Sequence, residues 1–98
     1  MDIHNEVAAT DSSNPPAEVL DLQVIQHVLW FYGDPVWGLE PGHFTVALLT
    51  AFVNADLGNF ALLASSFPAQ GYWVRMLRHH PEGMQIAVDA AQRLAARS

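Results

Sequence analysis

Residues 41–74 form a long stretch in which Asp56 is the only residue with a formal charge at pH 7. A helix that crosses a membrane needs about 20 consecutive apolar residues. The polar run at 54–59 and the pair Phe67-Pro68 divide this stretch into pieces of roughly ten residues, which are too short to span a bilayer. The pattern therefore predicts core helices of a soluble protein, without a membrane partner.

Composition places the chain among small globular domains. It has 98 residues, of which 51% are hydrophobic and 14% are charged, so one domain with one core is expected. A core of this size stabilises a lone domain only marginally, and such chains often gain stability from self-association. The absence of cysteine excludes disulfides, thiolate zinc sites and cysteine nucleophiles, and the absence of lysine excludes Schiff-base chemistry and a lysine-dependent phosphate loop.

The charge of the chain is unevenly distributed. The net charge is −6, and all four basic residues lie in the last quarter, at Arg75, Arg78, Arg93 and Arg97. This distribution lacks the basic face that a phosphate backbone requires, so we do not expect direct binding to nucleic acid. The first residues have neither a basic segment nor an apolar core typical of a signal peptide, which predicts a cytoplasmic protein.

The N-terminal residues 1–14 are polar and acidic, and they predict a flexible tail ahead of a single helical domain over 15–98. Asn14, or Ser13, is the expected N-cap of a first helix from about Pro16 to Tyr32, with Gly33 as its stop. The residues that follow, from Gly33 to Glu40, are rich in turn formers and predict a connection.

Further cap and break signals predict four more short helices. Pro41 begins one that ends near Asn54, Asp56 caps the next with help from Asn59, and Pro68 begins a third. The helix after Asp56 is expected to bury one side, made of Leu57, Phe60, Leu63, Ala64 and Phe67. The last helix follows Gly83. No strand pattern is present, so the expected fold is all-α, a compact bundle of about five short helices preceded by the flexible acidic tail.

Two of these helices carry more apolar surface than one small core can enclose. The first presents an unusually broad apolar arc, and the second is apolar on two opposite sides. On this second helix, one face consists of Phe44, Leu48, Ala51, Phe52 and Ala55, and the opposite one carries Val46 and Val53. Helix-to-helix self-association would cover such surface, with a dimer as the simplest form. The residues expected at this interface are Val24, Val28, Trp30, Phe31, Trp37, Val46 and Val53.

No catalytic, cofactor-binding or metal-ligating residue can be assigned. His79 and His80 project about 100° apart on a helix and do not easily share one metal ion. His80, near a helix end, is expected to interact with terminal carbonyl groups. The serines do not occur in a nucleophile turn, and Asp34 and Glu40 lie together on one connection without an identifiable partner. We therefore expect a protein that is not an enzyme and has no cofactor.

Short motifs of the central region are similar to those of small uncharacterised helical proteins encoded by phages of actinobacteria. The shared pattern covers about half of the chain and consists of Tyr32-Gly33, Pro41-Gly42-His43-Phe44 with Ala47-Leu48, Ala55-Asp56 with Asn59, Phe67-Pro68, and Pro81 with Gly83. The resemblance implies a helical fold and a phage origin, and with it the cytoplasm of a bacterial host. It implies no activity.

Three hypotheses for the function follow. The first is a non-enzymatic protein–protein interaction module that forms a homo-oligomer, with a phage accessory protein acting on a host protein as its specific form. The second is an acidic decoy of a nucleic-acid-binding protein, suggested by the eight acids and no base of residues 1–74. The third is a small enzyme of unknown class, which would need a pocket with convergent polar groups.

Overall fold

Residues 14–97, which the computed structural model describes, form α-helices joined by short connections and contain no strand. The elements are a short 3-10 helix, η1 (Ala17–Val19), and five α-helices, α2 (Leu22–Phe31), α3 (His43–Asn54), α4 (Leu57–Ser66), α5 (Pro68–His79) and α6 (Gly83–Arg97). The predicted all-α compact bundle with five short helices is confirmed. The predicted tail, apart from Asn14, lies outside the described residues.

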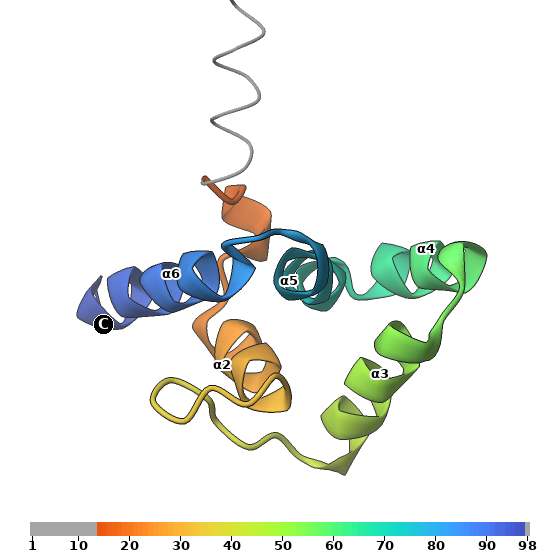
Figure 1. Ribbon diagram of the computed structural model, residues 1–98, viewed down its shortest axis with the longest axis horizontal. Helices are drawn as coiled ribbons and strands as arrows, with labels where there is room; N and C mark the ends of the chain where they lie inside the picture. Colours follow the sequence, from red (N-terminus) through yellow and green to blue (C-terminus); the bar gives the residue numbers. More distant parts are fainter. Residues whose placement is uncertain (1–13, 98) are drawn as a thin grey trace, which may run out of the picture.

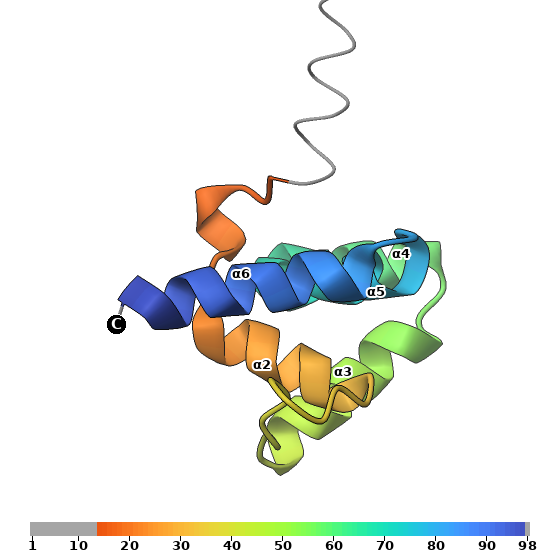
Figure 2. The ribbon, with the colours of Figure 1, turned by 60° about the vertical axis from the view of Figure 1, so that its left-hand side comes forward.

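Helix α5 is the centre of the fold and contacts η1 and each of the other four helices (Figure 1). Helices α3 and α4 lie on one side of it and α6 lies on the other. Figure 2 shows α6 running alongside α5, with α2 and α3 below the pair. In this arrangement the side chains of Trp73 and Val74 of α5 are buried, and α4 packs mainly on α5.

The core surrounds Trp73 of α5, whose side chain is fully buried. Its indole Nε1–H donates a hydrogen bond of 2.8 Å to the carbonyl oxygen of Val19, which ties η1 to the central helix. Helices α2, α3 and α6 supply most of the remaining core. The other buried hydrophobic residues are Val19, Ile25, Val28, Leu29, Leu48, Leu49, Phe52, Val74, Ile86, Ala87, Ala90 and Ala91.

The first predicted helix is two elements, and the prediction of Asn14 as its N-cap is wrong. The double proline begins only the 3-10 turn η1, whose N-cap is Pro16. The chain then leaves the helical region at Leu20, and the Asp21 side chain accepts a hydrogen bond from the Val24 amide at 3.2 Å. Asp21 therefore caps a separate helix, because a short carboxylate at that position competes with continued helix. The interruption also leaves the Val19 carbonyl available to the Trp73 indole.

The remaining boundaries are close to those predicted. Asp56 is the N-cap of α4, and its Oδ1 accepts a 2.8 Å hydrogen bond from the Asn59 backbone amide, so the helper at Asn59 is its amide rather than its side chain. Helix α3 begins at His43, two residues after the predicted start at Pro41, with Gly42 as its N-cap. Gly33 stops α2 with φ +89°, a conformation that favours glycine.

The connection between α2 and α3 is held against α2. The Gln26 side chain donates to the Trp37 carbonyl at 3.2 Å, and the Leu39 amide donates to the Gln26 carbonyl at 3.0 Å. Asp34 Oδ2 accepts from the Trp37 amide at 2.6 Å. The backbone of Gly38, the next residue, lies close against that of Trp30, and both Trp30 and Trp37 are half-buried.

Helix α4 differs most from its predicted packing. Leu57 was expected on the buried side but is 91% exposed, while Phe60, Leu63, Ala64 and Phe67 are only half-buried. None of the ten residues of α4 is fully buried. The physical reason is its position at the periphery, where only α5 covers it closely.

Helix α3 is also turned relative to its predicted apolar face. The core receives Leu48, Leu49 and Phe52, whereas Phe44, expected on the buried face, is 68% exposed. Ala51 of the same predicted face is exposed. Thus α3 and α4, which lie in the nearly uncharged stretch 41–74, both present apolar side chains outward.

Candidate interaction surface

The residues predicted for an interface do not form a common exposed surface. Val28 is 1% exposed and belongs to the core, so it is not available on the surface of this domain. The other six are half-buried, and Val24, Phe31, Trp37 and Val53 pack against the core. The broad apolar arc of the first helix is thus largely covered by the other helices of the same chain.

Three of the six large apolar side chains that are exposed among the described residues lie on α3 and α4; the other three are Val36 and Leu39 on the connection between α2 and α3, and Met84 of α6. Phe44 at the start of α3 and Leu62 in α4 are each 68% exposed. The Phe44 ring lies 6.1 Å from that of Phe67, at the end of α4, so an aromatic pair bridges the two helices. On the inner side, the rings of Phe52 and Phe60 approach to 5.1 Å.

A shallow groove of about 410 Å³ runs between these helices on their outer side. It is lined by Ala51, Asn54 and Ala55 of the α3 side and by Asn59, Leu62, Leu63, Ser66 and Phe67 of the α4 side. We call this the α3–α4 groove. Its lining contains no charged residue, and its polar side chains are those of Asn54, Asn59 and Ser66.

The spacing of these residues explains why they share one surface. On α4, positions 59, 62, 63, 66 and 67 follow the i, i+3, i+4, i+7, i+8 pattern of one helical face. Phe60 and Ala64 lie beside this face and pack against the core, as do Leu63 and Phe67 at its edge. Leu62 is therefore the large apolar side chain of this face that the domain leaves exposed.

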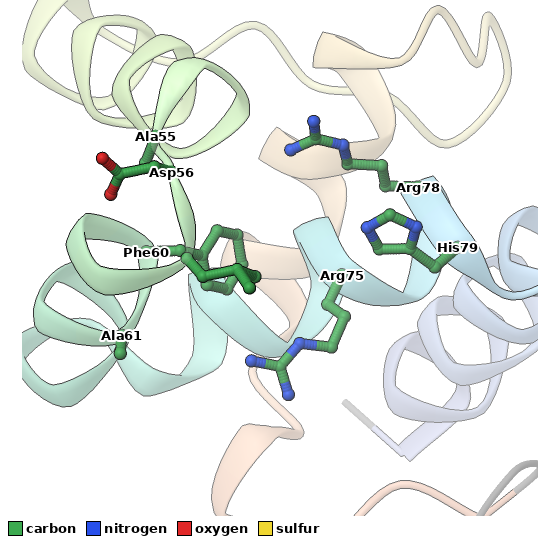
Figure 3. A pocket seen from close by; sticks show the side chains of 8 residues that line it. Ala55, Asp56, Phe60, Ala61, Arg75, Arg78 and His79 are labelled. Atoms are coloured by element: carbon green, nitrogen blue, oxygen red, sulfur yellow. The ribbon is translucent and has the colours of Figure 1, made fainter.

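A second groove, of about 490 Å³, lies between the first turn of α4 and the last turns of α5 (Figure 3). It is lined by Ala55, Asp56, Leu57, Phe60, Ala61, Arg75, Arg78 and His79. We call this the α4–α5 groove. The Arg75 guanidinium carbon lies 5.3 Å from the centre of the Phe60 ring, a cation–π distance. Figure 3 shows the Asp56 carboxylate pointing away from both arginines, toward the helix end that it caps.

Arg78 also acts on the α2 side of its helix. Burial raises the pKa of the Tyr32 hydroxyl above its usual value, and the positive charge of Arg78 partly offsets that rise. The Tyr32 hydroxyl is buried without a hydrogen-bond partner among the described residues. Arg78 therefore lines the α4–α5 groove and also lowers the pKa of the Tyr32 hydroxyl.

The described residues contain no group of three or more His, Asp or Glu side chains that could hold a metal ion. The prediction that His80 contacts terminal carbonyls is wrong, because its Nδ1 accepts a 3.0 Å hydrogen bond from the Glu82 backbone amide. His80 thereby holds the turn between α5 and α6. Asp89 likewise accepts from the Gln85 side chain at 2.9 Å.

Sequence reasoning missed the outward position of Phe44, Leu57 and Leu62. The sequence did contain one sign of this exposure. Leu62 shares a helical face with the polar residues Asn59 and Ser66, which indicates that this apolar side chain faces outward. Apolar residues on two sides of a peripheral helix indicate that one side is uncovered. Which helix is peripheral follows only from the tertiary arrangement.

Among residues 14–97, no helix is long and apolar enough to cross a membrane. The chain matches no family model, and no curated protein or solved structure is similar to it. The resemblance to phage proteins thus stays a prediction from the sequence motifs.

Proposed function

We propose that this chain is a non-enzymatic protein–protein interaction module that forms a homodimer through its α3–α4 groove. The observation that carries the proposal is the exposure of Phe44 and Leu62 on a surface whose groove lining has no charge. Exposed apolar surface of this kind, with amide and hydroxyl groups beside it and no charge, is typical of an interface.

The apolar side chains set the expected strength of the dimer. Burying one exposed Phe or Leu side chain contributes about 1.5–3 kcal/mol. A two-fold dimer buries Phe44 and Leu62 of both copies, while association itself costs at least several kcal/mol. We therefore expect a dissociation constant in the micromolar range or weaker, for which about 8 kcal/mol or less is needed.

Sedimentation velocity from micromolar to near-millimolar concentration tests this proposal. We expect a reversible dimer for the natural chain and a monomer for Leu62→Asp, because a carboxylate in the contact would have to lose its water. Val36→Asp is the matched control, since Val36 is 77% exposed on the connection between α2 and α3 and lies outside the groove lining. Dimerisation that Leu62→Asp leaves intact, or that Val36→Asp abolishes equally, would contradict the proposed surface.

The specific form of the function that we propose is a phage accessory protein acting on a host protein in the bacterial cytoplasm. Only the sequence motifs shared with actinobacterial phage proteins support this origin. A bacterial strain that expresses the chain and a matched strain that expresses Leu62→Asp provide the test. A change in the host that the natural chain causes and Leu62→Asp does not cause supports the proposal. If both strains show the same change, or neither shows one, the proposal is contradicted.

A further inference from the structure

Half of the basic residues of this acidic chain face one groove. Arg75 and Arg78 are exposed on α5, one turn apart, and both line the α4–α5 groove together with His79. Among the described residues, neither guanidinium is within 4.0 Å of a carboxylate. Asp56, the one acid in the lining, is engaged at the N-terminus of α4 and points away from them (Figure 3). The groove therefore presents two uncompensated positive charges.

Apart from Asp56, the opposite wall of this groove is apolar. Leu57 is 91% exposed at the start of α4, and Phe60 is half-buried beneath the Arg75 guanidinium. A ligand that suits both walls carries carboxylates beside aliphatic side chains. An acidic peptide with interspersed Val or Ile has this chemistry, whereas an inorganic anion would leave Leu57 in water.

Residues 1–13 of the same chain have this composition. They contain Asp2, Glu6 and Asp11 and no Lys or Arg, and Ile3 and Val7 follow two of the acids directly. The segment joins the domain at Asn14, immediately before η1, and η1 packs on α5. Thirteen residues extend up to about 45 Å, which is more than two of the three extents of the molecule, 48 × 36 × 22 Å. The segment is therefore long enough to reach the groove.

We propose that the acidic segment 1–13 binds in the α4–α5 groove of its own molecule, with its carboxylates at Arg75 and Arg78 and its aliphatic side chains against Leu57 and Phe60. The covalent connection makes a weak contact sufficient. A short flexible connection gives an effective concentration in the millimolar range, so an affinity of about 1 mM for the separate peptide would fill the groove in about half of the molecules. This binding does not rest on the homodimer, because its residues line a different groove.

Paramagnetic relaxation enhancement in the full chain tests the proposal. The chain has no cysteine, so Asn5→Cys offers a single attachment point for a nitroxide. We expect the label to broaden the amide signals of residues 57–61 and 75–79 selectively. Arg75→Glu with Arg78→Glu should abolish this broadening, while the matched control Arg93→Glu with Arg97→Glu makes the same charge change at the exposed end of α6 and should preserve it.

Several results would overturn the proposal. The broadening could be absent, could lie on another surface, or could survive Arg75→Glu with Arg78→Glu. Broadening that occurs in a mixture of isotope-labelled, spin-free chain with unlabelled, spin-labelled chain would show that the segment binds a second copy. A charge-swap experiment completes the design, with three substitutions in the segment: Asp2→Lys, Glu6→Lys and Asp11→Lys. In the natural background they should abolish the broadening. In the Arg75→Glu, Arg78→Glu background they should restore it.

Discussion

At the scale of single residues, Trp73 links the N-terminal 3-10 helix η1 to the central helix α5. Its ring is fully buried in the centre of the core, and its Nε1–H satisfies the carbonyl of Val19, which lies 54 residues earlier. A buried carbonyl that loses its donor costs about 1–3 kcal/mol, and the smaller ring of phenylalanine also leaves a cavity.

Trp73→Phe is therefore expected to reduce the free energy of unfolding by about 2–4 kcal/mol. Chemical denaturation followed by circular dichroism measures this loss. Trp30→Phe is the control, because Trp30 is half-buried at the edge of the domain and its change should cost less. Equal losses for the two variants would show that the bond to Val19 contributes little.

A second residue-scale prediction concerns His27 of α2. Burial lowers the pKa of its imidazole below the ordinary value of 6.5, and the nearby Asp21 carboxylate offsets part of that shift. The unfolded chain therefore binds a proton more readily at this position than the folded chain does. Stability from this source is fully present above pH 6.5 and declines as pH falls below it, toward the lowered pKa.

His27→Gln should consequently make stability decline less between about pH 7.5 and about pH 5.5 than it does in the natural chain. The effect is small, because the imidazole is only partly buried. Urea unfolding midpoints at several pH values measure it, and the other histidines are common to both proteins. If stability declined more steeply with falling pH in the variant than in the natural chain, the pKa of His27 could not be lowered by folding.

At the scale of elements, α4 and α5 approach closely at Gly71. A β-carbon on Gly71 would lie 2.9 Å from that of Ala64 and 3.3 Å from the Phe52 ring. Alanine there would push α4 away from α5 and disturb the core. Gly58, in the first turn of α4, has only the Asp56 carboxylate nearby, at 3.8 Å.

Gly71→Ala is thus expected to destabilise the domain by about 1–3 kcal/mol through overpacking. Gly58→Ala should stabilise it by about 0.5–1 kcal/mol, because alanine favours helix and meets no steric conflict there. Thermal unfolding of both variants gives the comparison. If Gly71→Ala proved as stable as Gly58→Ala, the two helices could not be as close as described.

The element scale also shows how far sequence reasoning reached. The prolines at 41 and 68, the cap at Asp56 and the stop at Gly33 predicted the number of α-helices and most of their ends, because these signals act locally. Asp21 was missed as a cap because the continuous apolar pattern around it favoured one long helix. The exposed face of α4 was missed because it depends on which other helices pack around α5 and leave α4 at the periphery. Such contacts between distant segments have no local signal in the sequence.

At the scale of the whole molecule, the nearly uncharged stretch of residues 41–74 has two roles. Its inner side chains, including Phe52 and Trp73, build the core, and its outer ones, including Phe44 and Leu62, line or flank an uncharged groove. The interface predicted from sequence lay mainly on the first helix, where the domain covers its own apolar surface. Surface left over by a small core explains why Phe44, Leu57 and Leu62 are exposed on α3 and α4, the helices most distant from α6 in Figure 1.

The most direct test of this account is a concentration series of amide chemical shifts from the isotope-labelled full chain. The homodimer predicts shifts that change with concentration at Phe44, at residues 51–55 and at residues 59–67, and that saturate as the dimer fills. Amides near Val36 and in α6 should stay constant. Shifts that do not change up to near-millimolar concentration, or that change mainly on α2 or α6, would contradict the assignment of the α3–α4 groove as the interface.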